Sequence, residues 1–362
     1  MTNVGVFEFP EIKLAYVFLF GILGSLTAYL PLWYKSIGIA KEQIGFLTGI
    51  GPVIVLVAGP VVPAIGDLTR NKIAVLAVGA TCGVAARTIM YFLAREFWII
   101  LLLSALFSAS MSGLPSLLDS ISVERTRGGY GSARLLGSIG FGIAALIAGT
   151  LIGDGKFERA FEMNVLYGFC FILVLLKFRD LDAGESDSQR DDAGSVSFVR
   201  GLLRSLQRPD ACLFLVVTLF SGSFCGVLDS YLFLRLKELG APGVLMGLAR
   251  FVNCISEIPF FFYIRPLMER IGIFNLVALA QLGYILRFAT YSVVSNPWTI
   301  LPMEAIHGLT FASFYACGVH FFRAIAPPNG RSTMQVISSL HHGISPAQES
   351  FNPRLTEPIN YK

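Results

Sequence analysis

Charged residues are scarce in this sequence. Only 14% of its 362 residues are Asp, Glu, Lys or Arg, whereas soluble domains carry about 25%. Hydrophobic residues make up 54% of the chain, and the mean hydropathy is +0.66. This balance is typical of a protein that lives in a bilayer. A nucleic-acid-binding protein gathers its basic residues on one soluble surface, which this chain does not have, so we expect no nucleic-acid partner.

The motifs of enzymes and metal sites are also missing. The six cysteines include no CxxC pair and no metal-ligand spacing, and they fall inside apolar runs. We therefore expect neither disulfides nor a zinc site, and we expect the cysteines to act as small packing residues. The sequence contains no Gly-rich phosphate loop after a strand and no nucleophile elbow around a serine. These absences predict that the protein is not an enzyme and needs no cofactor or metal.

Long apolar runs are what the sequence does contain. A helix needs about 20 apolar residues to cross roughly 30 Å of hydrocarbon, and ten runs have this length. They predict an all-α polytopic membrane protein with spans at 12–34, 43–65, 72–94, 97–122, 131–153, 160–178, 211–236, 243–264, 271–294 and 298–323. An eleventh run begins near Ser332 but passes into a polar stretch rich in Pro and Asn, so we expect a C-terminally truncated set of spans.

A polar stretch divides the spans into two halves. Residues 178–210 are charged, rich in Ser and Gly and poor in aromatics, as linkers are. The halves resemble each other at a shift of 200 positions, at which Arg87, Tyr91 and Trp98 recur as Arg287, Tyr291 and Trp298. We expect an N-terminal six-helix bundle at 1–177, a linker at 178–210, an incomplete C-terminal bundle at 211–344 and a polar tail at 345–362.

The basic residues are distributed unevenly between the two sides of the predicted membrane. If the N-terminus and the linker are cytoplasmic, the loops on that side carry roughly twice as many Lys and Arg residues as the loops on the other side. This asymmetry predicts a multi-pass protein whose N-terminus and central linker face the cytoplasm.

Two paired bundles suit a solute carrier whose central site is exposed to each side in turn. Four segments also resemble spans four, five, eight and ten of one branch of the major facilitator superfamily: "PSLLDS" at 115–120, "YGSARLLGSIGFGIAALIAG" at 130–149, "SEIPFFF" at 256–262 and "EAIHGLTFASFYA" at 304–316. That branch contains lactose-permease-like sugar and nucleoside proton symporters and the domain-containing protein 6 group. The resemblance covers residues 12–344 and implies two six-helix bundles related by an internal repeat.

The loop after the second span departs from the signature of that superfamily. It reads "PAIGDLTRNK", in which Asp67 and Lys72 occupy matching places, while Pro63, Leu68 and Arg70 replace the usual residues. In the family this loop ties helix ends together in one conformation. The resemblance therefore implies an ion-pair or gating role for Asp67 and Lys72.

Several ionisable residues lie inside the predicted spans, where a charge costs about 2.5–3.5 kcal/mol or more unless it faces a cavity or a partner. Arg250, Asn253 and Glu257 lie on one stripe of the eighth span. This stripe faces a central cavity or Asp229 of the seventh span. We assign Glu257 and Asp229 to proton coupling, Asn253 to the solute and Arg250 to an ion pair. A permanent structural ion pair between helices is the alternative for Glu257.

Glu304 and His307 are neighbours on one face of the tenth span, because they are three residues apart. Histidine titrates near neutral pH, so this pair is a candidate for proton coupling. A hydrogen bond that fixes helix packing is the alternative. Pro302 and Gly308 favour a bend in the same span.

In the first half, Asp119 and Arg134 flank a short loop and can approach each other. The resemblance implies that an acidic residue on span four and an arginine on span five hold the solute. Arg134 matches that arginine, while Asp119 matches the acidic position only approximately. The alternative for both is a pair that closes the cytoplasmic gate. We expect the recurring Arg87 and Arg287 to share a structural or gating role, such as capping carbonyls or snorkelling to the interface, and contact with the solute is the alternative for both.

Taken as a whole, the sequence predicts transport of a small polar organic solute by alternating access, as a proton symport. A membrane receptor or regulatory protein that binds a partner on a transporter scaffold is the alternative. We expect a monomer whose partners are the solute, protons and the lipid bilayer.

Overall fold

All the regular structure in the computed structural model is helical, in the residues that the structure describes: 10–59, 61–69, 71–93, 96–126, 130–153, 155–178 and 208–325. The helices before the linker are α1 (Pro10–Leu26), η1 (Thr27–Tyr29), α2 (Leu30–Ser36), α3 (Lys41–Ala58), α4 (Val61–Thr69), α5 (Lys72–Leu93), α6 (Phe97–Met111), α7 (Leu114–Thr126), α8 (Tyr130–Ile152) and α9 (Glu158–Phe178). The helices after it are α11 (Pro209–Glu238), α12 (Gly243–Ile271), α13 (Ile273–Val293), η3 (Pro297–Ile300), α14 (Leu301–Ala305), η4 (Gly308–Ser313) and α15 (Phe314–Ile325).

Within the described residues, nine helical segments are long and apolar enough to cross a membrane. They correspond to nine of the ten predicted spans. The remaining predicted span, 43–65, is divided between α3 and α4, and α3 also contains Pro52. Pro52 does not end the helix, because α3 continues to Ala58. The predicted run near Ser332, the tail and nearly all of the linker lie outside the described residues.

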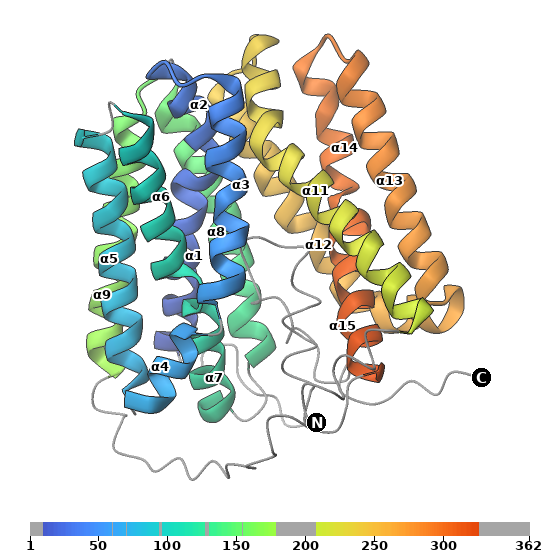
Figure 1. Cartoon of the computed structure of the whole chain (residues 1–362), viewed down its shortest axis with the longest axis horizontal. Coiled ribbons are helices and arrows are strands. Elements are labelled where there is room, and N and C mark those ends of the chain that lie inside the picture. Colours follow the sequence, from blue (N-terminus) through green and yellow to red (C-terminus); the bar gives the residue numbers. More distant parts are fainter. Residues whose placement is uncertain are drawn as a thin grey trace.

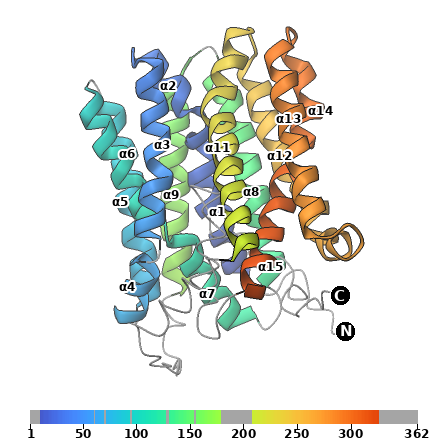
Figure 2. The same ribbon diagram turned by 45° about the vertical axis from the view of Figure 1, so that its right-hand side comes forward.

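The helices that precede the linker lie mainly on one side of the molecule, and α11–α15 lie on the other (Figures 1 and 2). The two groups meet where α8 packs against both α1 and α12. Glycine makes this approach possible. A Cβ atom at Gly149 would lie 2.4 Å from the Gly243 carbonyl oxygen, and one at Gly247 would lie 2.7 Å from the Leu146 Cα atom. Small residues allow membrane helices to pack closely, so α8 and α12 form a tight contact between the two groups.

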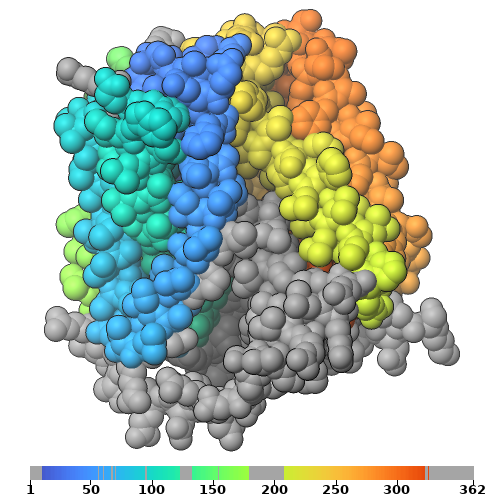
Figure 3. Space-filling view, in the orientation of Figure 1, coloured from blue at the N-terminus to red at the C-terminus, as the bar shows by residue number. Residues whose placement is uncertain are grey.

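The groups also meet at the end of the molecule where α2 finishes. There Glu238 at the end of α11 accepts hydrogen bonds from Lys35 at 3.3 Å and from Lys41 at 3.2 Å. Away from this end, α11 slants away from α3, so that the Pro209 end of α11 lies far from the Ala58 end of α3 (Figures 1 and 3). The two helices therefore converge at one end and diverge toward the other.

Candidate functional site

A cluster of buried charge lies between α12, α13 and the helices of the tenth span. Arg287 on α13 is 1% exposed and Glu304 on α14 is 0% exposed. The Arg287 Nη2 atom lies 3.0 Å from Glu304 Oε2, and the Arg287 Nε atom donates to the Tyr291 hydroxyl at 3.0 Å. That hydroxyl in turn donates to Glu304 Oε1. Both carboxylate oxygens of Glu304 are thus bonded, which offsets the cost of burying the ion pair.

His307 extends this cluster to α12. Its Nδ1 atom lies 3.1 Å from Arg287 Nη1, and its Nε2 atom lies 3.3 Å from Glu257 Oε1. The result is a continuous path of polar contacts from Glu257 through His307 and Arg287 to Glu304. Because a guanidinium has donors but no acceptor, Nδ1 must accept from Arg287. The contact fits a neutral His307 whose proton lies on Nε2, the ring nitrogen that faces Glu257 Oε1 at 3.3 Å.

The backbone around His307 departs from a regular α-helix. The α-helix α14 ends at Ala305, and a π-helix runs from Gly308 to Ser313. Short π-helical segments are frequent at functional sites. Gly308 permits close contact with α12, since its N–H donates to the Ser256 hydroxyl at 3.0 Å and a Cβ atom there would lie 2.1 Å from the Ser256 carbonyl oxygen. This contact holds His307 against the helix that carries Glu257.

Asp229 and Arg250 form a second ion pair between α11 and α12. The Arg250 Nη2 atom lies 2.5 Å from Asp229 Oδ1. The side chain of Asp229 is 38% exposed, whereas that of Arg250 is 13% exposed. Although Arg250 and Glu257 lie on one stripe of α12, the arginine pairs with Asp229 and the glutamate with His307. The two charges of this stripe therefore belong to two separate pairs.

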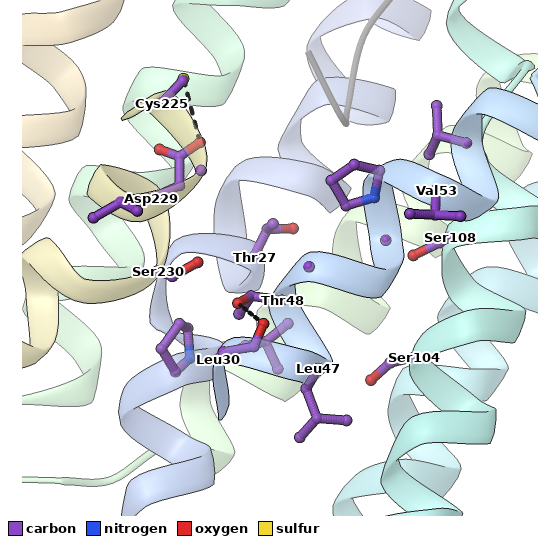
Figure 4. A pocket seen from close by; sticks show the side chains of 18 of the residues that line it. Thr27, Leu30, Leu47, Thr48, Val53, Ser104, Ser108, Cys225, Asp229 and Ser230 are labelled. Carbon is purple, nitrogen blue, oxygen red and sulfur yellow. Dashed lines mark hydrogen bonds between the residues drawn. The ribbon is translucent and has the colours of Figure 1, made fainter. Parts of the chain in front are cut away.

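Asp229 faces a cavity of about 650 Å³ between α1–α3, α5, α6 and α11. Figure 4 shows Asp229, Ser230 and Cys225 on one wall of this cavity and Ser104 and Ser108 on the opposite wall. A cavity of this size can hold a small organic molecule. We call it the central cavity below.

Arg134 on α8 lies outside the central cavity. It is 2% exposed, and its Nε, Nη1 and Nη2 atoms have no hydrogen-bond partner in the part of the chain that the structure describes. The guanidinium carbon lies 4.5 Å from the centre of the Phe20 ring and 5.7 Å from that of Tyr16. Arg134 and Glu257 line the same small cavity, of about 20 Å³, which has room for about one water molecule but not for a solute.

Asp119 does not hydrogen bond with Arg134. Instead, its Oδ1 atom accepts from the Tyr16 hydroxyl at 2.5 Å, so the Tyr16 side chain lies between the two predicted solute ligands. Asn253 is 4% exposed, and its Oδ1 atom has no partner among the described residues.

The remaining predicted site residues fall in two places. Arg87 on α5 is 5% exposed and lines the central cavity, with its guanidinium carbon 3.9 Å from the centre of the Phe107 ring. Both Arg87 and Arg287 are thus buried, and the suggested snorkelling to the interface is wrong for both. Asp67 lies in α4 and Lys72 begins α5, but the side chain of Asp67 and the whole of Arg70 lie outside the described residues.

Sequence reasoning did not find Tyr16 or Tyr291 as site residues. Tyr291 was visible only as part of the repeat, four residues after Arg287, a spacing that places it on the same helix face. The six cysteines are free. Cys82 and Cys212 are exposed on the outside of the helices, so the expected packing role is wrong for these two. Across the described segments, no group of three or more His, Cys, Asp or Glu side chains is placed to hold a metal ion.

Comparisons with known proteins agree with this architecture. The model of the MFS_1 like family matches residues 9–351. The maltose permease of Geobacillus stearothermophilus is 28% identical over 332 residues, which cover 90% of this chain and 82% of that protein. The uncharacterized transporter YwbF of Bacillus subtilis (strain 168) is 24% identical over 332 residues, which cover 90% of this chain and 80% of that protein.

The fold is also that of solved transporters. A mutant of the nucleoside transporter NupG aligns with a TM-score of 0.77 at 17% sequence identity, covering 92% of this chain and 87% of that one. The likeness at this identity concerns the fold alone. The chain belongs to the MFS_1 like family and is a multi-pass membrane transporter of the major facilitator superfamily, a solute carrier rather than an enzyme.

Proposed function

We propose that this transporter moves a small polar organic solute together with protons, by alternating access. The observation that carries the proposal is the buried path from Glu257 through His307 and Arg287 to Glu304. Ionisable residues are expensive inside a membrane protein and mark proton relays and substrate paths. A path that contains two carboxylates and a neutral histidine has sites both for accepting a proton and for passing it on.

Proton binding would change the contacts that hold the two groups of helices together. A protonated Glu257 attracts His307 less, and it also loses its attraction for Arg134, which lies across the small cavity on α8. A protonated His307 has N–H groups at both ring nitrogens and can no longer accept from Arg287. Glu257 and Arg134 lie on the tightly packed α12 and α8. A charged Glu257 would hold these helices together through its attraction for Arg134, and a protonated Glu257 would favour their separation.

The solute would enter the central cavity, whose volume of about 650 Å³ suits a small organic molecule. The related maltose permease carries a sugar name, so sugars are the first solutes to test for transport. In our proposal, Arg134, Asp119 and Asn253 contact the solute only after α8 and α12 separate, because the small cavity beside Arg134 is too small for it in this conformation. Asp229 joins the coupling residues, since it borders the central cavity and pairs with Arg250.

The orientation and organisation are part of the proposal. The loops on the side of the N-terminus and the linker carry roughly twice as many Lys and Arg residues as the loops on the other side, which favours a cytoplasmic N-terminus and linker. We also propose bundles at 1–177 and 211–344, separated by the linker at 178–210. The chain would work as a monomer. Asp67 and Lys72 would restrain the loop after α4.

A liposome experiment tests the coupling. The full chain is reconstituted in liposomes that contain a pH-sensitive dye, and maltose, sucrose and other sugars are added one at a time. A carried sugar should acidify the lumen, and Glu257→Gln should abolish the acidification while exchange of that sugar continues. The matched control is Glu162→Gln, which removes an exposed carboxylate paired with Arg159 on α9. Accumulation of a sugar without any pH change, or acidification that Glu257→Gln leaves intact, would overturn proton coupling through Glu257.

A further inference from the structure

Arg87 is a buried cation without a carboxylate. It is 5% exposed, its Nη1 atom has no hydrogen-bond partner, and it forms no ion pair with any residue that the structure describes. Its neighbour is the Tyr34 hydroxyl, which interacts with Arg87 by charge and by hydrogen bonding and also shares a hydrogen bond of 2.9 Å with Ser104. A buried charge inside a membrane protein usually has a partner of opposite sign. Among the residues that the structure describes, Arg87 has no such partner.

The internal repeat shows which partner is missing. Arg87 and Arg287 are 200 positions apart, and at the same shift Glu304 corresponds to Ser104 and His307 corresponds to Phe107. The geometry follows this correspondence: Arg287 contacts the His307 ring nitrogen at 3.1 Å, and Arg87 lies over the Phe107 ring at 3.9 Å. In the second half, Glu304 neutralises its arginine. In the first half, the corresponding Ser104 has no charge, and it lines the central cavity together with Arg87.

The rest of the cavity wall favours an apolar body. Leu23, Leu47, Val53 and Met111 are among its lining residues. Several of its hydroxyls use their proton within their own helix: Thr48 donates to the Ile44 carbonyl at 3.0 Å, Ser223 to that of Leu219 at 2.8 Å and Ser112 to that of Ala109 at 2.9 Å. A sugar needs many free hydrogen-bonding groups around it, because each unpaired hydroxyl costs free energy. The lining is mostly apolar, so it suits an apolar body better than a sugar, and Arg87 supplies a cationic side chain in it.

We propose that the central cavity binds an organic monocarboxylate with an apolar body, and that its carboxylate occupies at Arg87 the place that Glu304 occupies at Arg287. The inference deepens the proposed function and rests on it, since it names the class of solute that this carrier takes. Arg87 is then a solute-binding residue, and the Asp229–Arg250 pair leaves the guanidinium of Arg87 as the uncompensated charge of the cavity.

Two ligands of the same shape test the charge requirement. The purified full chain in nanodiscs is titrated calorimetrically with 4-phenylbutyrate and with its neutral amide, and the heats from empty nanodiscs are subtracted. The carboxylate should bind more tightly than the amide by about tenfold or more, because charge-assisted hydrogen bonds to arginine are strong. Equal affinity for the two ligands, or binding of maltose with none of the carboxylate, would overturn the proposal. This comparison needs no variant.

Variants at Ser104 and Arg87 locate the site. Ser104→Glu supplies a carboxylate from the protein and should abolish the preference for 4-phenylbutyrate while raising the thermal stability. Ser104→Gln is the matched neutral control and should keep the preference. Arg87→Gln should lower the affinity for the carboxylate to that for the amide, whereas Arg235→Gln, which removes an exposed arginine near the end of α11, should change neither. A preference that survives both Ser104→Glu and Arg87→Gln would place the anion elsewhere and refute the site.

Failure of this inference is distinguishable from failure of the proposed function. If sugar addition acidifies the liposome lumen and the carboxylate shows no preferential binding, proton-coupled transport stands and the monocarboxylate site is refuted. If the carboxylate binds at Arg87 but no solute moves protons, the binding site stands and the coupling is refuted.

Discussion

The Nε2 atom of His307 lies 3.3 Å from the Oε1 atom of Glu257, across the contact between α12 and the tenth span. The other ring nitrogen of His307 faces Arg287 at 3.1 Å. One imidazole thus joins a carboxylate on one helix to a guanidinium on another. Because arginine can only donate, the proton of a neutral His307 must lie on the side of Glu257.

This geometry predicts the tautomer of His307. Nitrogen NMR of ¹⁵N-histidine-labelled protein at neutral pH should show one histidine with a bare Nδ1 and a protonated Nε2, and this signal should disappear in His307→Asn. On acidification the same residue should gain a proton on Nδ1 and lose its hydrogen bond from Arg287. A His307 signal with the proton on Nδ1 at neutral pH would contradict the contact with Arg287.

The Arg287–Glu304 ion pair should be strongly coupled in stability. Removing one partner leaves a buried charge, so Arg287→Gln and Glu304→Gln should each lower the free energy of unfolding by about 3–5 kcal/mol. The double variant leaves no uncompensated charge and should lose much less than the sum of the single losses. Thermal or denaturant unfolding of all four proteins in one detergent gives this comparison. Additive losses would show that the two side chains do not interact.

Glu238 should help to hold the converging ends of α3 and α11 together. It accepts hydrogen bonds from Lys35 and Lys41, but all three side chains are partly exposed. The two contacts together therefore stabilise the closed end by at most about 1 kcal/mol. Glu238→Gln should therefore raise the rate at which a polar maleimide labels Thr48→Cys in the central cavity, by at most about fivefold. High salt should produce a similar increase in the unaltered protein, since it screens surface charges.

The control for that measurement is Glu162→Gln, which breaks the exposed pair with Arg159 on α9 and should leave the labelling rate unchanged. If Thr48→Cys is labelled at the same rate with and without Glu238→Gln at low salt, the contacts of Glu238 with Lys35 and Lys41 do not restrain the opening of the cavity at this end.

The membrane fold was predictable from the sequence because a bilayer imposes a minimum length and hydropathy on every span. These limits identified nine spans that are also helical segments in the structure. The span at 43–65 was predicted as continuous because hydropathy averages over short interruptions. Its division between α3 and α4 depends on local backbone geometry, which a hydropathy pattern does not record.

The pairing of charges was much less predictable. Helical spacing showed that Arg250 and Glu257 lie on one stripe, and that Glu304 and His307 are neighbours. It could not show which neighbouring helix each residue meets, because that depends on the rotation and depth of every helix. Hence Arg250 pairs with Asp229 and Glu257 with His307. The burial of Arg287 depends on Glu304, which is 17 residues away in the sequence.

Infrared difference spectroscopy of the purified protein tests most directly whether Glu257 takes up a proton. Spectra recorded on stepwise acidification should contain the carbonyl band of a newly protonated, buried carboxylic acid. We predict that Glu257→Gln removes this band and that Glu162→Gln retains it. An unchanged band in Glu257→Gln would contradict the account, because Glu257 would then carry no proton between the two groups of helices.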